Sequence, residues 1–243
     1  MSRSWESKLF LHMTTVERIQ LAKTKTDRVV DHLLYLLALH ENNAIITYSD
    51  TLSSQITLAH AAGAFRVFRA GLHQFEIVRL CALWDRAKDD KENIPTEESI
   101  PTIVELIALP EVIDTVAKKV QGQWPEPDDD KFARKQAMKA RVELRKAIED
   151  ARKISKSSML KKAMNLRHKH LAHSLTKTNL EKAGRVARMK YGDERKLLFK
   201  SLPIVEALHR WINASGFSFA NSQKIARNNA EALWKRCTFD IQR

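Results

Sequence analysis

The segment from about Ile56 to Lys88 constrains the fold more than any other part of the chain. Its large apolar side chains form one helical stripe and continue onto a neighbouring face: Phe65, Phe68, Leu72 and Phe75, followed by Ile77, Leu80 and Trp84. A helix that is apolar on more than one side has to be covered on more than one side. We therefore predict one long helix that lies at the centre of a bundle or at a dimer contact.

Helical spacing recurs along the rest of the chain. We predict further helices over about residues 14–39, 131–154, 157–175, 203–214 and 222–235, and either one modest helix or a helix pair over 103–120 with Pro110 at its joint. The stretch ENNAIITYSDTLSSQ, residues 41–55, breaks the pattern and is predicted to be a loop that has room for a short strand at Ile45–Tyr48. Ser157 or Ser158 is the expected N-cap of the helix that follows it.

The composition agrees with a helical protein. The chain of 243 residues has only 6 Gly and 6 Pro to form turns, and its 44% hydrophobic residues suffice for a sizeable core. We predict an all-α helical bundle with additional C-terminal helices. Residues 1–55 would supply the N-terminal helix and loop, 56–180 the core, and 181–243 a basic segment and the C-terminal helices, packed on the same domain.

The net charge indicates which partners to expect, and the cysteines indicate the redox environment. Lys and Arg number 42 against 29 Asp and Glu, which gives a formal net charge of +13. A surface this basic attracts polyanions, so RNA, DNA or an acidic protein is the expected partner. Cys81 and Cys237 lie in no CxxC pair, and no signal peptide or membrane-spanning stretch is seen. We expect a reducing, cytoplasmic setting away from the membrane.

The sequence RHKHLAH, residues 167–173, concentrates an arginine and three histidines in a predicted helix. On a helical wheel with Leu160 at zero, Arg167 falls at about −20°, inside the apolar stripe, where a charge is costly unless it is paired. His170 and His173 fall at about −80° and −140°, on one flank of that stripe, while His168 points to the other side at about 80°. A helix or a second subunit packed on the stripe would hold that flank in a cleft.

Three interpretations compete for this motif. His170 and His173 have the i, i+3 spacing of two metal ligands, but no HExxH, paired carboxylate or cysteine accompanies them, so neither a metal nor another cofactor is expected. The seven residues can also be a solvated basic turn without a chemical role. The third interpretation is acid–base catalysis on a phosphodiester, in which a histidine moves the proton of a ribose 2′-OH and an arginine holds the phosphate.

The spacing of arginine and histidine does not decide among these interpretations. Arg66 and His73 in the long apolar segment stand at a similar spacing, and about two such pairs are expected by chance in a chain with 9 His. Two side chains from one helix also rarely surround a phosphate. A catalytic site would therefore need a second copy of the motif from a twofold-related subunit.

At these residues the sequence resembles the HEPN superfamily, and most closely its abortive-infection AbiU-like branch. HEPN proteins carry an arginine, four to six further residues and then a histidine, with Asn, Asp or His commonly after the arginine; Arg167-His168 fits this rule, and Arg66-Val67 does not. The branch often reads Arg-Asn-Lys-His-x-Ala-His, from which RHKHLAH departs only at His168. RLCALWD, residues 79–85, is similar to the Arg-Leu…Asp ending of an earlier long helix in that branch. The resemblance covers about residues 59–178.

The resemblance implies a HEPN-like bundle that acts as a metal-independent endoribonuclease and a homodimer. Arg167 and His173 would take the catalytic roles, His168 the polar position that assists the site, and His170 the second histidine of the branch. Many relatives are toxins in bacterial defence or abortive infection, often paired with a nucleotidyltransferase-like antitoxin. Others have lost catalysis and serve as RNA-binding or protein-interaction modules, and this alternative stays open here.

Cations near the motif and beyond it are candidates for contact with RNA: Lys161, Lys162 and Lys169 around the motif, and Arg185, Arg188 and Lys190 in the basic stretch of residues 182–200. Such cations give a salt-dependent affinity that does not read sequence, although a basic stretch can equally be a solvated surface. Tyr191 and Phe199 are available for base stacking, but two aromatic residues do not establish it. DNA binding by the C-terminal helices is a further alternative.

Overall fold

The computed structural model describes residues 10, 12–56, 60–86, 97–123, 130–171 and 175–239. These residues form helices and their connections, with no β-strand among them, which confirms the predicted all-α fold. None of the helices in these ranges is long and apolar enough to cross a membrane. The chain divides into two compact units. Unit 1 comprises residues 1–31, 82–160 and 197–217, and unit 2 comprises residues 32–81, 161–196 and 218–243.

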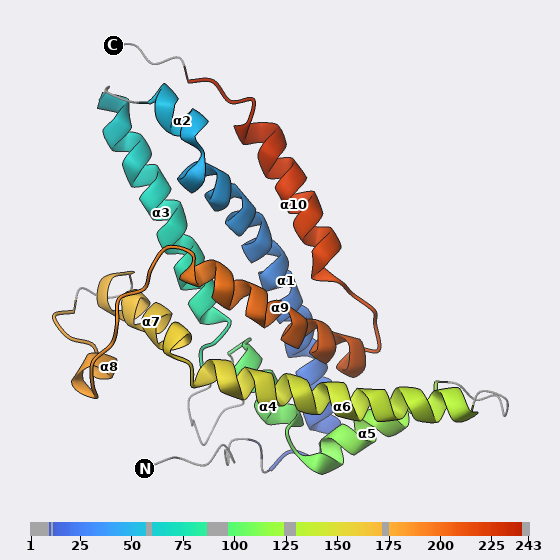
Figure 1. The fold of residues 1–243 in the computed structure, drawn as a ribbon. Helices are drawn as coiled ribbons and strands as arrows, with labels where there is room; N and C mark the ends of the chain where they lie inside the picture. The colour runs from blue at the N-terminus through green and yellow to red at the C-terminus, as the bar shows by residue number, and fades with distance from the viewer. Residues whose placement is uncertain are drawn as a thin grey trace. The chain divides into compact units, whose positions relative to one another are not determined.

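The helices follow one another along the chain as Figure 1 labels them. They are α1 (Thr15–Tyr48), α2 (Asp50–Gln55), α3 (His60–Ala82), α4 (Ile100–Ile107), α5 (Pro110–Gln121), α6 (Asp130–Ser155), α7 (Ser158–Leu166), α8 (Asn179–Lys182), α9 (Asp193–Ile212) and α10 (Phe219–Trp234). A π-helical turn, Arg167–Leu171, continues from the end of α7. Helices α1 and α9 each contribute residues to both units.

Unit 1 has an apolar core in which α6 packs on α4 and α5. Small apolar side chains recur every three or four residues along α6 and are buried: Ala133, Ala137, Ala140, Leu144, Ala147 and Ala151. Pro101 and Pro110 stand in the first turns of α4 and α5, where a missing N–H removes no helical hydrogen bond. Of the two possibilities predicted for residues 103–120, one helix or a pair, the structure has the pair with its joint at Pro110, and the predicted helix over residues 131–154 is confirmed.

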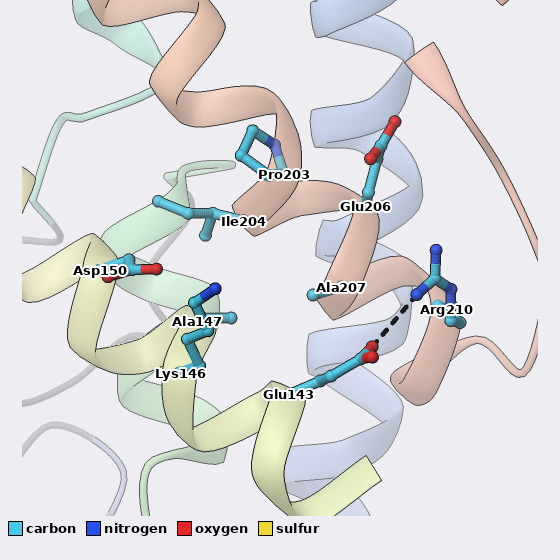
Figure 2. A pocket seen from close by; sticks show the side chains of 9 residues that line it. All are labelled: Glu143, Lys146, Ala147, Asp150, Pro203, Ile204, Glu206, Ala207 and Arg210. Carbon is cyan, nitrogen blue, oxygen red and sulfur yellow. Dashed lines mark hydrogen bonds and ion pairs between the residues drawn. The ribbon is translucent and has the colours of Figure 1, made fainter. Parts of the chain in front are cut away.

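Unit 1 also contains a pocket of about 250 Å³ between α6 and α9 (Figure 2). Three carboxylates and two cations line it: Glu143, Asp150 and Glu206, with Lys146 and Arg210. Arg210 Nη1 donates to Glu143 Oε2 at 3.1 Å, the contact that Figure 2 marks, and Trp211 Nε1 donates to the same oxygen at 2.8 Å. The charges of this pocket therefore largely balance one another.

Unit 2 overturns the prediction of a loop over residues 41–55. Helix α1 continues to Tyr48, and α2 follows it, so the strand expected at Ile45–Tyr48 is helical. The polar run that suggested a loop binds other helices instead. Glu41 accepts hydrogen bonds from Gln223 and Arg227 of α10 at 2.8 and 3.0 Å. These partners lie far away in the sequence, so the local pattern could not reveal them.

The next two residues of α1 are bound in the same way. Trp234 of α10 donates to Asn42 Oδ1 at 2.7 Å. Asn43 donates to Glu76 Oε2 of α3 at 2.7 Å, and His40 Nδ1 lies 2.7 Å from the other oxygen of that carboxyl group. Helices α3 and α10 are thus joined to the second half of α1 by side-chain hydrogen bonds.

Helix α3 is the described part of the long helix that the apolar stripe predicted. It ends at Ala82 and not at Lys88, which lies outside the described residues. Glu76, Ile77, Leu80 and Cys81 near its end are buried. Phe68 and Phe75 of the predicted stripe, however, are 47% and 42% exposed. Phe65 and Leu72 are half-buried, so the first part of the apolar stripe is only partly covered by the described residues of one chain.

Helix α9 corrects the predicted start of the helix over residues 203–214. It begins at Asp193, inside the stretch predicted to be a basic connection, and Pro203 lies within it. Pro203 looks like a helix start because it cannot donate a hydrogen bond to the preceding turn. The turns before it are nevertheless held in the interior, where Leu197, Leu198 and Ser201 are buried. The second C-terminal helix, α10, ends one residue before the expected Lys235.

Candidate active site

The motif lies in a π-helical turn and not in a straight α-helix. Ser157 caps α7 by accepting a hydrogen bond from Leu160 N at 3.2 Å, as one of the two predicted N-caps. The α-helix ends at Leu166, and Arg167–Leu171 then forms the wider turn. The prediction of an α-helix through to Leu175 is therefore wrong at Arg167–Leu171 and at Leu175, which is not helical, while residues 172–174 lie outside the described residues. Turns of this type are rare and occur frequently at functional sites.

The wider turn changes where the motif side chains lie. Positions on a wheel of about 100° per residue no longer apply within it. His168 was expected on the side opposite to the motif's other histidines, yet its Nε2 lies 3.4 Å from Arg167 Nη2. Both side chains are half-buried. The π-helical turn thus brings His168 to the arginine that the sequence placed apart from it.

Residues after the motif hold the turn in place. Leu175 N donates to Lys169 O at 3.1 Å. Asn165, buried in the last turn of α7, donates to Glu181 Oε1 at 3.1 Å and accepts a hydrogen bond from Thr178 Oγ1. Lys169 Nζ donates to both oxygens of the Glu181 carboxylate at 2.9 and 3.0 Å. The short helix α8 is therefore attached to the motif at two points.

Thr178 and Glu181 form a capping box at the start of α8. Glu181 N donates to Thr178 Oγ1 at 3.1 Å, and Thr178 N donates to Glu181 Oε2 at 3.3 Å. The hydrogen bond from Asn165, followed by that from Lys169, lowers the pKa of Glu181 from 4.5 to about 2. At neutral pH this carboxylate is charged, and it holds the side chain of Lys169, which belongs to the same π-helical turn as Arg167.

A tight turn brings Tyr191 to the motif. Asp193 N donates to Lys190 O at 3.1 Å, which closes a four-residue turn just before α9. Gly192, its third residue, has φ 86°, as a type II turn requires. Lys190 N donates to Asp193 Oδ2 at 3.1 Å, and Gly192 N donates to the carboxylate of Glu194 at 2.9 and 3.0 Å. Tyr191 therefore stands on a well-anchored backbone, although its side chain is 72% exposed.

A pocket of about 350 Å³ lies between the motif, α3 and this turn, entirely within unit 2. We call it the motif pocket. Its walls come from α3, the end of α7 with the π-helical turn, and the connection before α9: Ala70, His73, Gln74, Ile77, Leu166, His170, Leu171, Met189, Lys190 and Tyr191. The rings of His73 and Tyr191 stack with centroids 4.8 Å apart and planes tilted by 30°. None of the described residues that line it is Asp or Glu.

The residues predicted to be catalytic are placed as follows. Arg167 and His168 lie together in the π-helical turn, and His170 is exposed and faces the motif pocket. His173 lies outside the described residues, so its position relative to Arg167 stays a prediction. Among the residues that the structure describes, no three His, Cys, Asp or Glu side chains gather in a group that could hold a metal ion.

The predicted RNA contacts divide into two groups. Lys169 is paired with Glu181, and Lys162 with Asp193 at 3.7 Å, so both cations are engaged within the fold. Lys161 of α7, and Arg185, Arg188 and Lys190 of the connection between α8 and α9, have exposed side chains. Of these six residues, only Lys190 also lines the motif pocket.

The residues that support and flank the motif were not predicted from the sequence. Thr178-Asn-Leu-Glu181 is a Thr-x-x-Glu capping box, a local signal that could have predicted the start of α8. The same signal marks Glu181, whose carboxylate binds Lys169 through both oxygens; we call this contact the clamp on Lys169. His73 was dismissed along with Arg66 because that pair did not fit the motif, although His73 itself reaches the motif pocket. No local pattern indicates that His73 and Tyr191 stack.

Comparison with known proteins settles the family. The model of the HEPN family AbiU2 matches residues 22–233 of the chain. The chain belongs to the AbiU2 family of HEPN proteins. The match extends beyond the residues that carried the resemblance in the sequence, and it takes in α9 and most of α10. No curated protein and no solved structure matches the chain.

The AbiU2 match includes the motif, the stacked pair and the clamp on Lys169 within one family domain. The resemblance to the AbiU-like branch that the sequence motif indicated is thereby confirmed. The helices at the C-terminus also belong to the matched AbiU2 region, and α10 contributes partners of α1 in unit 2. The matched region reaches from within α1 to within the last turn of α10.

Proposed function

We propose that this AbiU2 protein is a metal-independent endoribonuclease. The observation that carries the proposal is the π-helical turn, in which Arg167 and His168 lie side by side and His170 faces a pocket that has no carboxylate among its described lining residues. An arginine can bind a phosphate through two parallel hydrogen bonds and stabilise the charge of its transition state. A histidine changes its charge near neutral pH and is suited to proton transfer.

The proposed reaction uses the 2′-OH of the substrate as the nucleophile. The 2′ oxygen attacks the adjacent phosphorus while an imidazole, assigned to His173, accepts its proton. The bond from phosphorus to the 5′ oxygen breaks, and the leaving oxygen takes a proton from a second acid. The products are a 2′,3′-cyclic phosphate and a 5′-OH. Arg167 would hold the phosphate, with His168 and His170 assisting.

A homodimer would supply the second acid and the second arginine. One copy of the motif provides groups on one side of a phosphate, and a twofold-related copy would enclose it. The exposed side chains of Phe68 and Phe75 on α3 give unit 2 an apolar surface for such a contact. A role as a toxin in bacterial defence or abortive infection, held in check by a nucleotidyltransferase-like antitoxin in the cytoplasm, would follow from this activity.

The test is cleavage of a single-stranded RNA by the purified chain and by its Arg167→Ala and His173→Ala variants. We expect cleavage that persists in a chelator, yields cyclic phosphate ends and falls by at least about 10²-fold in each variant. Lys146→Ala in the unit 1 pocket is the matched control and should cleave at the normal rate. A requirement for divalent metal with 5′-phosphate products would refute the mechanism.

Measuring the mass in solution for the same variants separates catalysis from assembly. If both variants stay dimeric and lose cleavage, the loss lies in the chemistry. If the unchanged chain binds RNA but never cleaves it, the AbiU2 protein is a binding module and not an enzyme. Duplex DNA affinity that survives both substitutions would indicate a separate site on the C-terminal helices.

A further inference from the structure

The motif pocket has the shape and lining of a site for one nucleotide. Its volume of about 350 Å³ is near the lower end of the range of about 300–1,000 Å³ for small-ligand pockets. A group of that size fits, whereas a longer stretch of nucleic acid does not. The pocket also lies beside the segment that carries Arg167, because Leu166, the residue before it, and His170 and Leu171 of the same turn line the pocket.

The aromatic wall of the pocket is built for stacking. His73 covers part of the Tyr191 ring at 4.8 Å, and yet the Tyr191 side chain remains 72% exposed. An exposed ring on an anchored turn offers a flat apolar face that loses little freedom when a second ring covers it. The exposed amide of Gln74 lies in the same wall and can both donate and accept hydrogen bonds at a base edge.

The charges of the lining residues favour an anionic ligand more in the motif pocket than in the second pocket of unit 2. A second pocket of about 310 Å³ is lined by Glu41, Glu194 and Glu231 along with cations and Tyr48. Those carboxylates would repel a phosphate. The motif pocket carries Lys190 and two histidines, and no Asp or Glu among its described residues. Of the two pockets, only the motif pocket presents an aromatic face together with uncompensated positive charge.

We propose that the motif pocket binds one unpaired nucleotide of an RNA strand, with its base stacked on Tyr191 and a phosphate near Lys190 and His170. That the ligand is RNA rests on the proposed function. A base in a duplex is already stacked and paired, so the pocket selects single strands, loops or ends. The bound nucleotide would set the position of the adjoining phosphate at Arg167.

The experiment measures RNA affinity without cleavage, in the full chain carrying His173→Ala. The probe is a fluorescein-labelled single-stranded RNA of mixed sequence, followed by fluorescence anisotropy. Adding Tyr191→Ala should weaken binding roughly five- to hundredfold, the range for loss of one stacked base, whereas Tyr191→Trp should retain the affinity. Tyr48→Ala removes a similarly exposed tyrosine, 61% exposed, from the acidic pocket and is the matched control.

A second probe isolates the stacked base. The probes are a set of RNAs, each of which lacks one base at a different position. One of these RNAs should bind the His173→Ala chain weakly, with the affinity that the intact RNA has for the chain carrying both His173→Ala and Tyr191→Ala. On that RNA, Tyr191→Ala should have no further effect. Equal affinities with and without the Tyr191 ring, equal losses at Tyr48 and Tyr191, or equal binding of a fully paired duplex would each refute the pocket assignment.

The outcomes distinguish this inference from the proposed function. RNA binding that depends on Tyr191, in a chain that never cleaves RNA, would refute the nuclease and leave the nucleotide pocket standing. Cleavage that depends on Arg167 and His173, with KM and affinity indifferent to Tyr191, would support the nuclease and overturn the pocket. A complete lack of RNA binding by the His173→Ala form would overturn the pocket as well.

Discussion

The two units bind their buried charged groups in different ways. In unit 1, Arg18 donates to the carbonyl oxygens of Phe10 and Leu106, and Thr26 donates to that of Ala22. Side chains also pair in the described interior of unit 1, Trp84 with Ser201 and Ser99 with Thr102, but these groups are neutral. In unit 2, the buried carboxyl group of Glu76 binds the side chains of His40 and Asn43. A backbone carbonyl is present whatever the sequence, whereas a side-chain partner has to be the right residue.

This difference bears on stability and on pH. Losing one member of a side-chain pair leaves the other buried and unsatisfied, which costs more than the hydrogen bond itself contributes. A group whose pKa differs between the folded and the unfolded chain also makes stability depend on pH, and unit 2 contains His32 and Glu181, whose pKa values are strongly lowered. Unit 2 should therefore respond more strongly than unit 1 to single polar substitutions and to acid, and unit 2 contains the motif.

The largest effect is expected at Glu76, which is 2% exposed. Glu76→Ala would strip His40 and Asn43 of their shared acceptor in the interior of unit 2. We expect a loss of about 2–5 kcal/mol in the free energy of unfolding, measured by denaturant titration. Thr26→Val in unit 1 is the matched control and should cost only about 1 kcal/mol. Equal costs at the two sites would break the contrast between the units.

The same contrast explains how far the fold could be predicted from the sequence. Three helices of unit 1, α4, α5 and α6, follow from apolar periodicity, with proline in the first turns of α4 and α5, and they appear where predicted. In unit 2, Glu41-Asn42-Asn43 reads as a loop because each side chain finds its partner more than thirty residues away. Local patterns carry no information on such pairs.

The next largest effect is an acid response of unit 2 through His32 of α1. Burial, followed by the positive charge of Arg79, lowers the pKa of His32 from 6.5 to about 4. The unfolded chain therefore takes up this proton below about pH 6.5, and the folded chain only near pH 4. Stability should fall as the pH drops from 6.5 to 4 and should stay level with respect to this group below that range.

His32→Gln removes the titrating group and tests that response. The Tm of the unchanged chain, relative to that of the variant, should decline across pH 6.5 to 4 and be constant from pH 7 to 8. The ring is only partly buried, so solvent screening reduces the effect below the full value of the pKa shift. A difference in Tm that does not change between pH 7 and 4 would contradict the assignment.

A smaller effect is expected at Gly192, which has a positive φ of 86° in the turn that presents Tyr191. No atom lies within 4 Å of the position that a Cβ would take, so Gly192→Ala changes backbone strain alone. We expect a loss of about 1–2 kcal/mol. Gly71→Ala in α3, where the added Cβ also meets nothing, should instead raise stability by about 0.5–1 kcal/mol. Thermal unfolding measures both, and the same sign at the two glycines would contradict the role of the turn.

The candidate site shows a sharper limit of sequence reasoning than the fold does. The types of residue in the motif, together with their order, were enough to predict the family. The direction in which each side chain points could not be predicted, because the helical wheel assumes a regular α-helix. The structure has a π-helical turn there, next to the hydrogen bonds that join Asn165, Thr178 and Glu181. The motif pocket depends on the stack of His73 on Tyr191, a contact across 118 residues of sequence that no spacing rule contains.

The smallest effect on global stability, but a local one on the motif, is expected at Glu181. Its pKa is lowered from 4.5 to about 2, so its contribution is complete above about pH 4.5 and is lost as the pH falls toward 2. Glu181→Gln keeps the shape of the side chain but removes the charge that holds Lys169. Cleavage at neutral pH should drop by up to about a hundredfold, because the π-helical turn that carries Arg167 loses its ion pair with α8. The variant's Tm should also decline less than that of the unchanged chain between pH 4.5 and 2.

The matched control is Glu149→Gln, which breaks a similar ion pair with Lys153 in unit 1, at 2.8 Å, and should leave cleavage unchanged. A loss of cleavage in both variants would show that general surface charge, and not the clamp on the π-helical turn, controls the site.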